Sequence, residues 1–442
     1  MQLLTRTSSR LALALAAGLL FAGLPAPHAK AADLGGDCCA DLEERVAELE
    51  ATTVRKGNRK ISLTISGWVN AGVVWWSDGF GSTDLRDPTF FDHNADIYVV
   101  NNSTSQTRLN IDGSGKIREN LSAGFSISIR PWGDKLGDVS QVVHNPTPNN
   151  IDIRNTYVFL DAKDIGKLQL GQQDSAADGA WYQDLGGSST WISNVNPGAW
   201  NSSFHLRDNS GGLTDVTWGS VLQEMSDGQV PRIAFYSRQI SGFQFATSFG
   251  GNDTYATALY YANKFGTLNI AAGVGYDSSS KNSALIDQNV GTGLVDADHN
   301  RLNKLAMSGS IYESGSGLYG TLAWSKAYAA TAYRNDATNW YGKMGWRRNV
   351  NGMGETNVYG EYDRTTDAYA NDLQAHVWGV GLTQDLDTVG AVMYLGYRHT
   401  MLDNAIADPK LILTAGQTVA TNSEAVPSQH FDAVLAGMVV NF

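Results

Sequence analysis

The sequence predicts an all-β fold: a transmembrane antiparallel β-barrel of about 16 strands, preceded by a short N-terminal coiled-coil helix. Three observations predict it. From residue 61 onward, polar and apolar residues alternate with a period of two in stretches of about ten residues. Short turns and long polar connections alternate between these stretches. The chain also begins with an export signal. Alternating strands joined by connections of unequal length are typical of barrels in the bacterial outer membrane.

The composition excludes several classes of protein. Of the 442 residues, 42% are hydrophobic and 17% are charged, so the chain can bury a large apolar surface and is not disordered. The mean hydropathy of −0.24 excludes a bundle of membrane-spanning helices. A formal net charge of −12 argues against a nucleic-acid partner. The two cysteines, Cys38 and Cys39, are adjacent, which excludes a disulfide scaffold and a four-cysteine zinc site.

Residues 1–31 have the three parts of a secretory signal peptide. Arg6 and Arg10 form a positive start, residues 11–24 are apolar, and residues 29–31 read Ala-Lys-Ala, a small-x-small cleavage signal. The apolar stretch is too short to span a bilayer comfortably. The alternative, an N-terminal anchor helix, does not account for the cleavage signal. We therefore expect residues 1–31 to be removed after export.

Residues 32–60 are predicted to form a short periplasmic helix followed by a basic linker. Residues 41–51 are rich in helix formers. Leu42, Val46 and Leu49 have the spacing of a coiled-coil seam, but about two heptads are too short to be stable alone. We expect neighbouring subunits of an oligomer to complete the coiled coil; a solvated helix or a frayed linker is the alternative.

The predicted barrel occupies residues 61–442. Its clearest alternating stretches are residues 61–70, 123–130, 155–160, 167–172, 242–247, 304–311 and 431–442. Short turns are predicted at residues 112–115, 164–166, 314–317 and 385–388, and long polar connections near 77–104, 132–150, 174–230, 277–301 and 400–428. Aromatic residues near strand ends are expected to form interfacial girdles: Trp75, Trp76, Tyr157, Phe159, Trp324, Tyr359, Tyr394 and Tyr397.

A secreted β-sandwich is the alternative all-β fold. A sandwich buries an apolar face between two sheets and has loops of similar length at both ends, whereas these connections are unequal. The inward positions would be Ser, Thr, Asn, Gln and Arg, which suit a water-filled lumen. In lipid, only closure of the sheet pairs all backbone N–H and C=O groups. The barrel therefore explains the pattern better.

The last strand ends in a pattern that indicates an assembly signal. Within residues 437–442, the alternation places Met438, Val440 and the final Phe442 on one face. Together with Gly437, this stretch is similar to the terminal-strand signal that the barrel-assembly machinery recognises.

The chain resembles the alphaproteobacterial outer-membrane porins, a family of general-diffusion porins. The resemblance rests on residues 39–60 with Gly67 in the first strand, on the pair of strands at 154–160 and 167–172, and on the last strand. It implies a 16-stranded barrel in the Gram-negative outer membrane, a passive water-filled pore for small hydrophilic solutes and ions, and usually a homotrimer. It also implies contact with membrane lipid and lipopolysaccharide. The Pro-Glu-Phe-Gly-Gly segment of the constriction loop in well-studied trimeric porins does not occur in this sequence.

The pore chemistry is expected to depend on one long loop and three arginines. After Gln172 the chain runs to Gln229 without a clear spanning strand, and a loop of that length is usually functional. By resemblance, a loop at about 173–230 folds into the lumen and narrows it. The predicted constriction residues are Arg108, Arg130 and Arg154 on early strands, and Asp174, Asp178 and Asp184 on the loop. Opposed charges would create a field across the pore that orients polar solutes. In the alternative interpretation, the arginines pair with the carboxylates and stiffen the lumen.

No enzyme motif is convincing. A G-x-G-x-x-G match at residues 315–320 leads into a strand and not into a helix, so it predicts a hairpin turn. The sequence contains no P-loop, no nucleophile elbow and no H-E-x-x-H motif. We therefore expect neither an enzyme nor a cofactor or metal. Two function classes remain: a general-diffusion porin, and a specialised barrel that acts as a substrate-selective channel or an adhesin. Trp181, Trp191, Trp200 and Trp218 in the long loop leave an aromatic slide for a selective channel open.

Overall fold

The structure, a computed structural model, describes residues 60–80, 94–132, 135–144, 150–209, 211–222, 228–251, 254–279, 302–329, 335–404 and 426–442. The predicted signal peptide and the predicted helix with its seam of Leu42, Val46 and Leu49 lie outside these residues. In the described part of the chain, no helix is long and apolar enough to cross a membrane.

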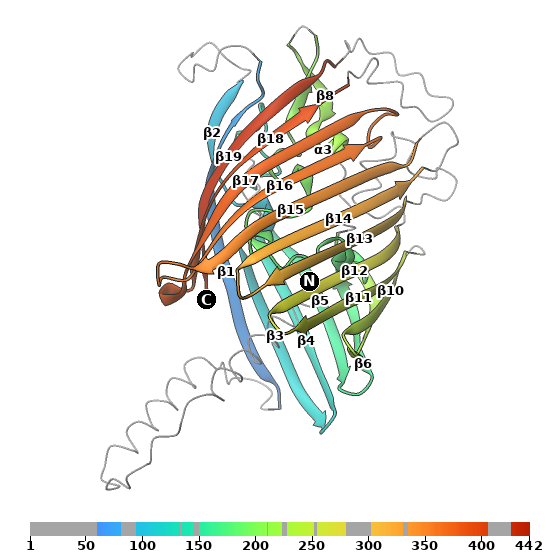
Figure 1. Ribbon diagram of the computed structural model, residues 1–442. Coiled ribbons are helices and arrows are strands. Elements are labelled where there is room, and N and C mark those ends of the chain that lie inside the picture. The colour runs from blue at the N-terminus through green and yellow to red at the C-terminus, as the bar shows by residue number, and fades with distance from the viewer. Residues whose placement is uncertain are drawn as a thin grey trace.

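Antiparallel strands close into a barrel (Figure 1). The strands are β1 (Ser62–Ser77), β2 (Ala95–Val100), β3 (Arg108–Arg118), β4 (Leu121–Trp132), β5 (Asn150–Ala162), β6 (Gly166–Gln173), β9 (Val230–Ser237), β10 (Phe243–Gly250), β11 (Tyr255–Phe265), β12 (Leu268–Ser279), β13 (Leu302–Glu313), β14 (Leu318–Tyr328), β15 (Ala337–Asn349), β16 (Glu355–Thr366), β17 (Gln374–Leu386), β18 (Ala391–Leu402) and β19 (Gln429–Asn441). The sheet has 17 strands, and β2 and β3 pair with different parts of β1. The barrel therefore has 16 strand positions, which confirms the predicted count of about 16.

The first and last strands close the ring. Trp68 to Ser77 of β1 pair with Asn441 to Asp432 of β19. The backbones of Gly67 and Phe442 also exchange two hydrogen bonds of 3.0 Å, which continue this pairing to the last residue. Closure leaves no free sheet edge, as a spanning sheet requires in lipid.

One strand position is interrupted. Between β2 and β3 the chain leaves the sheet and forms the short 3-10 helix η1 (Ser103–Ser105). Side chains replace the missing ladder bonds of β1: the Asn70 N–H donates to Thr107 Oγ1 at 3.0 Å, and Asn70 Nδ2 donates to the Ser105 carbonyl at 2.7 Å. Trp68 Nε1 donates to the Gln106 carbonyl at 2.8 Å. These bonds pair backbone groups of Asn70, Ser105 and Gln106 that the interruption leaves without ladder partners.

The connections differ at the two ends of the barrel. At one end the strands are joined by short turns, such as those from β3 to β4 and from β13 to β14. The other end carries the long connections, as the sequence predicts. The turn predicted at residues 112–115 is wrong, because this stretch lies within β3 and the turn follows Arg118. Gly113 serves a different purpose there: a Cβ atom at this position would lie 2.2 Å from the ring of Phe125 on β4. The glycine makes room for a neighbouring aromatic ring.

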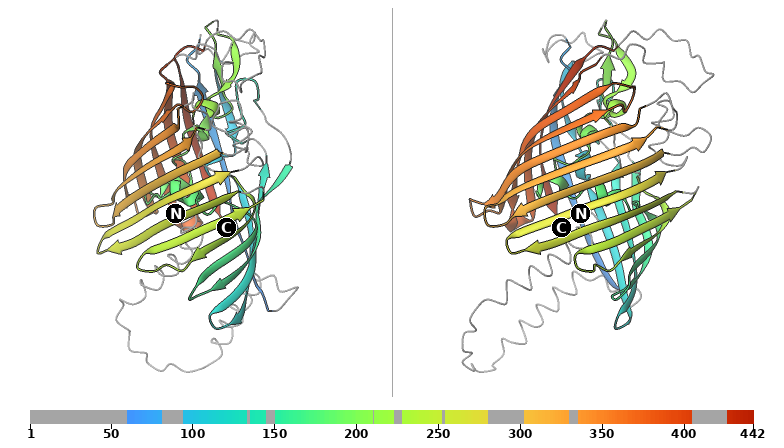
Figure 2. Two further views of the ribbon diagram at one scale, coloured as in Figure 1. Left: turned by 90° about the vertical axis from the view of Figure 1, so that its right-hand side faces the viewer. Right: turned by 45° about the vertical axis from the view of Figure 1, so that its right-hand side comes forward.

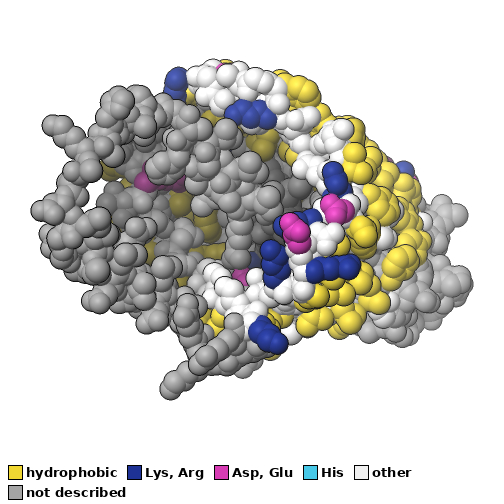
Figure 3. Space-filling model, turned by 90° about the horizontal axis from the view of Figure 1, so that it is seen from below, with side chains coloured by type: hydrophobic (Ala, Val, Ile, Leu, Met, Phe, Trp, Pro, Cys, Tyr) yellow, Lys and Arg dark blue, Asp and Glu magenta, His cyan; other side chains and the backbone are white. Residues whose placement is uncertain are grey.

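The outer surface is apolar and the inner surface is polar. Outward positions on β1 are Ile65, Val69 and Val73, which are all exposed, whereas Asn70 between them is buried. Viewed from the short-turn end, hydrophobic side chains cover the visible outer flank, and Lys and Arg side chains lie around the rim (Figure 3).

The girdle prediction is wrong for five aromatic residues. Tyr157 and Phe159 lie on the inner side of β5, on either side of the exposed, outward Val158. Trp76, Tyr359 and Tyr394 are buried, and they belong to a hydrophobic cluster that also contains loop residues. Alternation places them on the inner side of their strands, where they pack on the loop and do not reach lipid.

Candidate pore constriction

Most of the described part of the segment between β6 and β9 lies inside the barrel, and its hairpin rises at the end that carries the long connections (Figure 2). It contains the short helices η2 (Asp178–Trp181), η3 (Ser188–Thr190), η4 (Pro197–Trp200) and α3 (Trp218–Val221), and the small hairpin of β7 (His205–Arg207) and β8 (Leu213–Thr217). We refer to residues 174–229 as the inner loop.

Small and hydroxyl-bearing wall residues bring the first part of the inner loop close to β12 and β13. A Cβ atom at Gly275 of β12 would lie 2.9 Å from Ala177 and Ala180, so only glycine permits this approach without rearrangement. On β13, Ser308 Oγ accepts from the Gln183 N–H at 2.9 Å, and Ser310 Oγ accepts from the Leu185 N–H at 2.9 Å. The wall therefore binds the loop through its backbone.

A buried lysine fastens the loop to β15. Lys343 Nζ lies 2.5 Å from Asp184 Oδ2, and the two side chains are 0% and 3% exposed. The same ammonium group donates to Ser188 Oγ at 3.0 Å and to the Ser193 carbonyl at 3.2 Å. A buried ion pair of this kind is costly to break, because either partner alone would be an uncompensated charge.

A buried arginine fastens the next part of the loop to β16 and β18. Arg398 Nε donates to Glu361 Oε1 at 2.8 Å. Its guanidinium also donates to the carbonyls of Asn194 and Asn196 at 3.4 and 3.3 Å, and lies 4.8 Å from the ring centre of Trp200. Glu361 accepts in turn from Ser193 Oγ at 2.6 Å. One guanidinium thus joins two strands and the loop.

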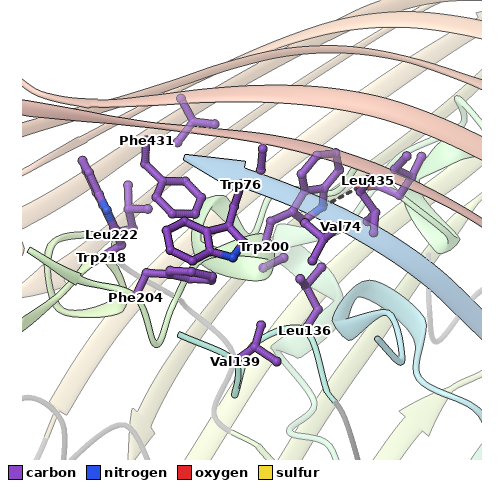
Figure 4. Close-up of a cluster of buried hydrophobic side chains, with 14 of the residues drawn as sticks. Val74, Trp76, Leu136, Val139, Trp200, Phe204, Trp218, Leu222, Phe431 and Leu435 are labelled. Carbon is purple, nitrogen blue, oxygen red and sulfur yellow. Dashed lines mark hydrogen bonds between the residues drawn. The ribbon is translucent and has the colours of Figure 1, made fainter. Parts of the chain in front are cut away.

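The second part of the inner loop forms an apolar plug in the part of the lumen near the long connections. Phe204 packs against Trp76 of β1 and Phe431 of β19, with ring centres 4.8 and 4.7 Å apart (Figure 4). Trp218 and Leu222 lie in the same cluster, together with residues between β4 and β5. This part of the lumen is packed like a domain core.

The loop also reaches the interrupted strand. Asn102 Nδ2 donates to the Trp191 carbonyl at 2.7 Å, and the rings of Trp191 and Trp68 meet edge to face at 5.9 Å. The guanidinium of Arg108 lies 4.9 Å from the centre of the Trp68 ring. The strand break and the loop therefore contact each other inside the lumen.

Partly exposed inward side chains lie along β3, β4 and β5. The inward side chains of Asp112, Ser126 and Tyr157 are partly exposed, whereas Asn339 on the opposite wall is fully buried. Asp112 accepts from Ser126 Oγ at 2.7 Å. Partly exposed, hydrogen-bonded polar side chains of this kind suit the wall of a water-filled passage.

The predicted arginines lie on this wall, but they do not all face loop carboxylates. Arg130 binds Asp152 of the neighbouring strand at 2.5 Å. Arg154 makes two hydrogen bonds, of 2.9 and 3.0 Å, with Asp174 at the base of the loop.

The remaining predicted loop carboxylates lie elsewhere. Asp178 begins η2, beside β12, and Asp184 pairs with Lys343 on the far side of the loop. Among the predicted arginines and loop carboxylates, the structure pairs Arg154 with Asp174.

The sequence analysis did not predict the wall residues that bind the inner loop, which are Lys343, Glu361 and Arg398. The alternation could have indicated them, since all three occupy inward positions on spanning strands, where a charge needs a partner. Their partners in the loop could not be predicted, because no periodicity indicates which loop atoms meet which strand.

Another buried ion pair closes the plug near the long-connection end. Arg207 Nε donates to Asp78 Oδ2 at 2.7 Å, and both side chains are 2% exposed. Burial raises the pKa of Asp78, and the adjacent guanidinium opposes this shift only in part.

The predicted assembly signal lies at the closure of the barrel. Met438, Val440 and Phe442 are exposed on the outer face. Gly437 lies on the inner face, where a Cβ atom would lie 2.3 Å from the Tyr394 hydroxyl.

A closed 16-position barrel with a polar wall and an inward-folded loop defines the class of outer-membrane channels. The sequence model of the Gram-negative porins matches residues 12–405, and the chain belongs to this family. It forms a diffusion channel in the outer membrane and is not an enzyme.

Solved structures have the same fold. The anion-selective porin from Comamonas acidovorans is 15% identical, with 86% of this chain and 100% of that chain covered and a TM-score of 0.54. In-vitro folded OmpT of Vibrio cholerae is 10% identical, with 88% and 99% covered and a TM-score of 0.52. Salmonella typhi OmpF in complex with daunomycin is 12% identical, with 88% and 99% covered and a TM-score of 0.50. At these identities the similarity concerns the fold alone. No curated protein matches the chain.

Proposed function

We propose that small hydrophilic solutes and ions diffuse through an eyelet between the inner loop and the wall of β3, β4 and β5. The observation that carries this proposal is the fastening of the loop: Lys343 and Arg398 hold it against the opposite wall. The inward Asp112, Ser126 and Asp152 on β3 to β5 remain partly exposed and polar, whereas Arg108, Ser128 and Arg154 on the same strands are buried.

We propose that Arg108, Arg130 and Arg154 set the charge of this eyelet, together with Asp174 and Asp178. The pair of Arg154 with Asp174 supports a stiffening role at the base of the loop. Arg108 and Arg130 are the proposed source of the field on the open wall. For Asp184 we propose stiffening alone, because its carboxylate is buried against Lys343.

Planar-bilayer recordings with sugars of graded size test the diffusion mechanism. We expect permeation to fall smoothly with solute size and not to saturate. Arg130→Gln should shift the ion permeability ratio toward cations, and Lys264→Gln, at an exposed position beside a short turn, is the matched control. Saturable flux of one sugar would favour the substrate-selective channel, and surface binding without flux would favour the adhesin.

The buried loop tryptophans argue against an aromatic slide. Trp181, Trp200 and Trp218 are each 1% exposed and belong to the packing between loop and wall. A slide needs ring faces that a passing solute can touch, and these three offer none.

We also propose a homotrimer of the alphaproteobacterial porin type. Residues 1–31 would be its signal peptide, residues 32–60 its periplasmic helix and linker, and residues 61–442 its barrel. The seam of Leu42, Val46 and Leu49 would join the subunits, and the end of β19 would be recognised by the barrel-assembly machinery. The spacing of the seam and the outward Met438, Val440 and Phe442 support these proposals.

A further inference from the structure

Two aromatic rings lie on the inner wall of the barrel among polar residues and glycines. Tyr157 and Phe159 of β5 alternate with Val158 and Leu160, which are 55% and 47% exposed on the outer face, so both rings point into the lumen. Both rings are partly exposed there. Their register neighbours on β4 and β6 are Ser126, Gly124, Gln169 and Gly171. A ring that faces water forfeits the free energy of its burial, so packing alone does not explain these two residues.

The wall beside Phe159 makes room for its ring. Phe159 pairs with Gly124 of β4 in the register, and a Cβ atom at Gly124 would lie 2.5 Å from Cζ of Phe159. A larger residue at position 124 would therefore displace the ring. The ring lies over the bare backbone of β4, which fixes its position in the lumen.

A lysine of the neighbouring strand β6 lies against the same ring. Lys167 Nζ is 4.1 Å from the centre of the Phe159 ring, within the range of a cation–π contact. Leu168 is 43% exposed on the outer face, so Lys167 points inward, where it is partly exposed. A ring face attracts a cation without occupying its N–H groups in directed hydrogen bonds. We refer to Tyr157, Phe159 and Lys167 as the lumen subsite.

The lumen subsite lies in the half of the pore near the short turns. The turn after Ala162 joins β5 to β6 at that end of the barrel (Figure 1). Asp174, at the base of the inner loop, follows the opposite end of β6. Short turns of outer-membrane barrels are periplasmic, so an entering solute meets the inner loop first and the lumen subsite second.

We propose that the lumen subsite binds carboxylates that carry a flat aromatic ring. The ammonium group of Lys167 supplies a charge-assisted hydrogen bond to the carboxylate. The rings of Tyr157 and Phe159 supply faces and edges against which the ring of the solute packs. In benzoate the carboxylate is attached directly to the ring, so one small molecule engages the ammonium group and a wall ring together. The proposal rests on the proposed function only in requiring an open lumen.

An aromatic carboxylate fits the lumen subsite better than a neutral sugar or an aliphatic anion. A sugar makes no use of the ammonium charge, and an aliphatic anion makes no use of the rings. Asp161 pairs with Lys167 in the register and adds a negative charge beside it. This charge weakens the hold on an anion, so binding stays brief, as passage through a channel requires.

Single-channel recordings of the full-length protein in planar bilayers test the proposal with benzoate, cyclohexanecarboxylate and acetate. Cyclohexanecarboxylate keeps the charge and the approximate size of benzoate but has no flat ring. We expect benzoate to interrupt the ionic current briefly, and the other two anions to do so more weakly. Phe159→Leu and Lys167→Gln should each weaken the apparent affinity for benzoate about two- to tenfold. Asp161→Asn should strengthen it.

The chain offers a matched control on its outer surface. Lys326 Nζ lies 5.0 Å from the centre of the Tyr328 ring. Alternation with the 72% exposed Leu322 of the same strand places both residues outside the lumen. Lys326→Gln and Tyr328→Leu should therefore leave the benzoate interruptions unchanged.

Equal interruption by benzoate and cyclohexanecarboxylate, or unchanged interruption in Phe159→Leu and Lys167→Gln, would overturn the proposal. Normal conductance in plain salt without a benzoate effect refutes the lumen subsite and leaves the proposed pore intact. If the parent does not conduct at all, the proposed pore fails. Saturation-transfer NMR of benzoate with the detergent-solubilised protein then still decides the proposal. Transfer from the parent that is lost in Lys167→Gln supports the lumen subsite, and equal transfer from both proteins refutes it.

Discussion

Replacing Lys343 with methionine should release part of the inner loop from the barrel wall. The side chain keeps its length but loses the ammonium group that binds Asp184, Ser188 and the Ser193 carbonyl. Removing one partner of a buried ion pair typically costs about 3–5 kcal/mol, because the other charge remains buried. That energy corresponds to a shift in equilibrium on the order of a hundredfold to a few thousandfold. We therefore expect Asp184 to leave its site and the surrounding loop to move into the eyelet.

The chain contains a close control for this substitution. Lys326 Nζ lies 2.6 Å from Asp336 Oδ2, nearly the same separation as in the Lys343–Asp184 pair, but these side chains are 28% and 34% exposed. Exposed pairs contribute about 0–1 kcal/mol. Lys326→Met should therefore behave like the parent, although the change in chemistry is identical.

Two measurements report the effect of Lys343→Met. Single-channel recordings should show frequent transitions to lower conductance, and the temperature at which the folded band is lost on SDS gels should fall. Combining Lys343→Met with Asp184→Asn should restore most of the parent behaviour, because no buried charge then lacks a partner. If Lys343→Met shows as few transitions to lower conductance as Lys326→Met, and is as heat-resistant, the position of the loop does not depend on the Lys343–Asp184 pair and our reasoning is refuted.

Three further predictions concern assembly, oligomer state and pH. Deletion of Phe442 should lower the yield of folded barrel in outer-membrane fractions while export continues, since two backbone hydrogen bonds and an outward aromatic ring are lost; normal yield would contradict a role in assembly. Replacing Leu42, Val46 and Leu49 with Asp should lower the melting temperature of the trimer on gels but leave conductance intact, and an unchanged temperature would exclude the coiled coil. Burial raises the pKa of Asp78, so the carboxyl group of Asp78 binds a proton more tightly in the folded protein than in the unfolded chain. The stabilisation from this protonation is present below the pKa that Asp78 has in the unfolded chain. It is lost as the pH rises through the pKa that Asp78 has in the folded protein. Asp78→Asn should flatten the dependence of the heat-denaturation midpoint on pH across this range, and an unchanged slope would contradict this assignment.

The alternation of polar and apolar residues was enough to predict the barrel, because lipid requires one face of each strand to be apolar. Residues 61–70 and 304–311 are good examples, since both lie almost entirely within observed strands. Turn composition was less reliable: Asp, Gly and Ser at residues 112–115 also suit a strand whose inner face is wet and whose outer face makes room for Phe125.

The candidate site was predictable only at the base of the loop. Arg154 and Asp174 are 20 residues apart on connected elements, so their pairing follows from a local hairpin. Asp184 and Lys343 are much further apart along the chain, and nothing in either segment indicates the other. Aromatic residues were misassigned for the same reason. An inward Trp76 is as hydrophobic as a lipid-facing one, and only the loop packed against it explains its direction.

The pairing of β1 with β19 also has a consequence for biosynthesis. These strands lie at opposite ends of the barrel sequence, so their contact has the largest sequence separation in the sheet. The backbone N–H and C=O groups of β1 that pair with β19 in the finished barrel therefore remain unpaired until the last strand has been synthesised and exported. During that interval an incomplete sheet exposes two edges that other chains can join. The pairing of β1 with β19 removes the free edges and so protects the finished barrel from aggregation. Before that pairing forms, the chain depends on other proteins to cover its edges on the way to the membrane.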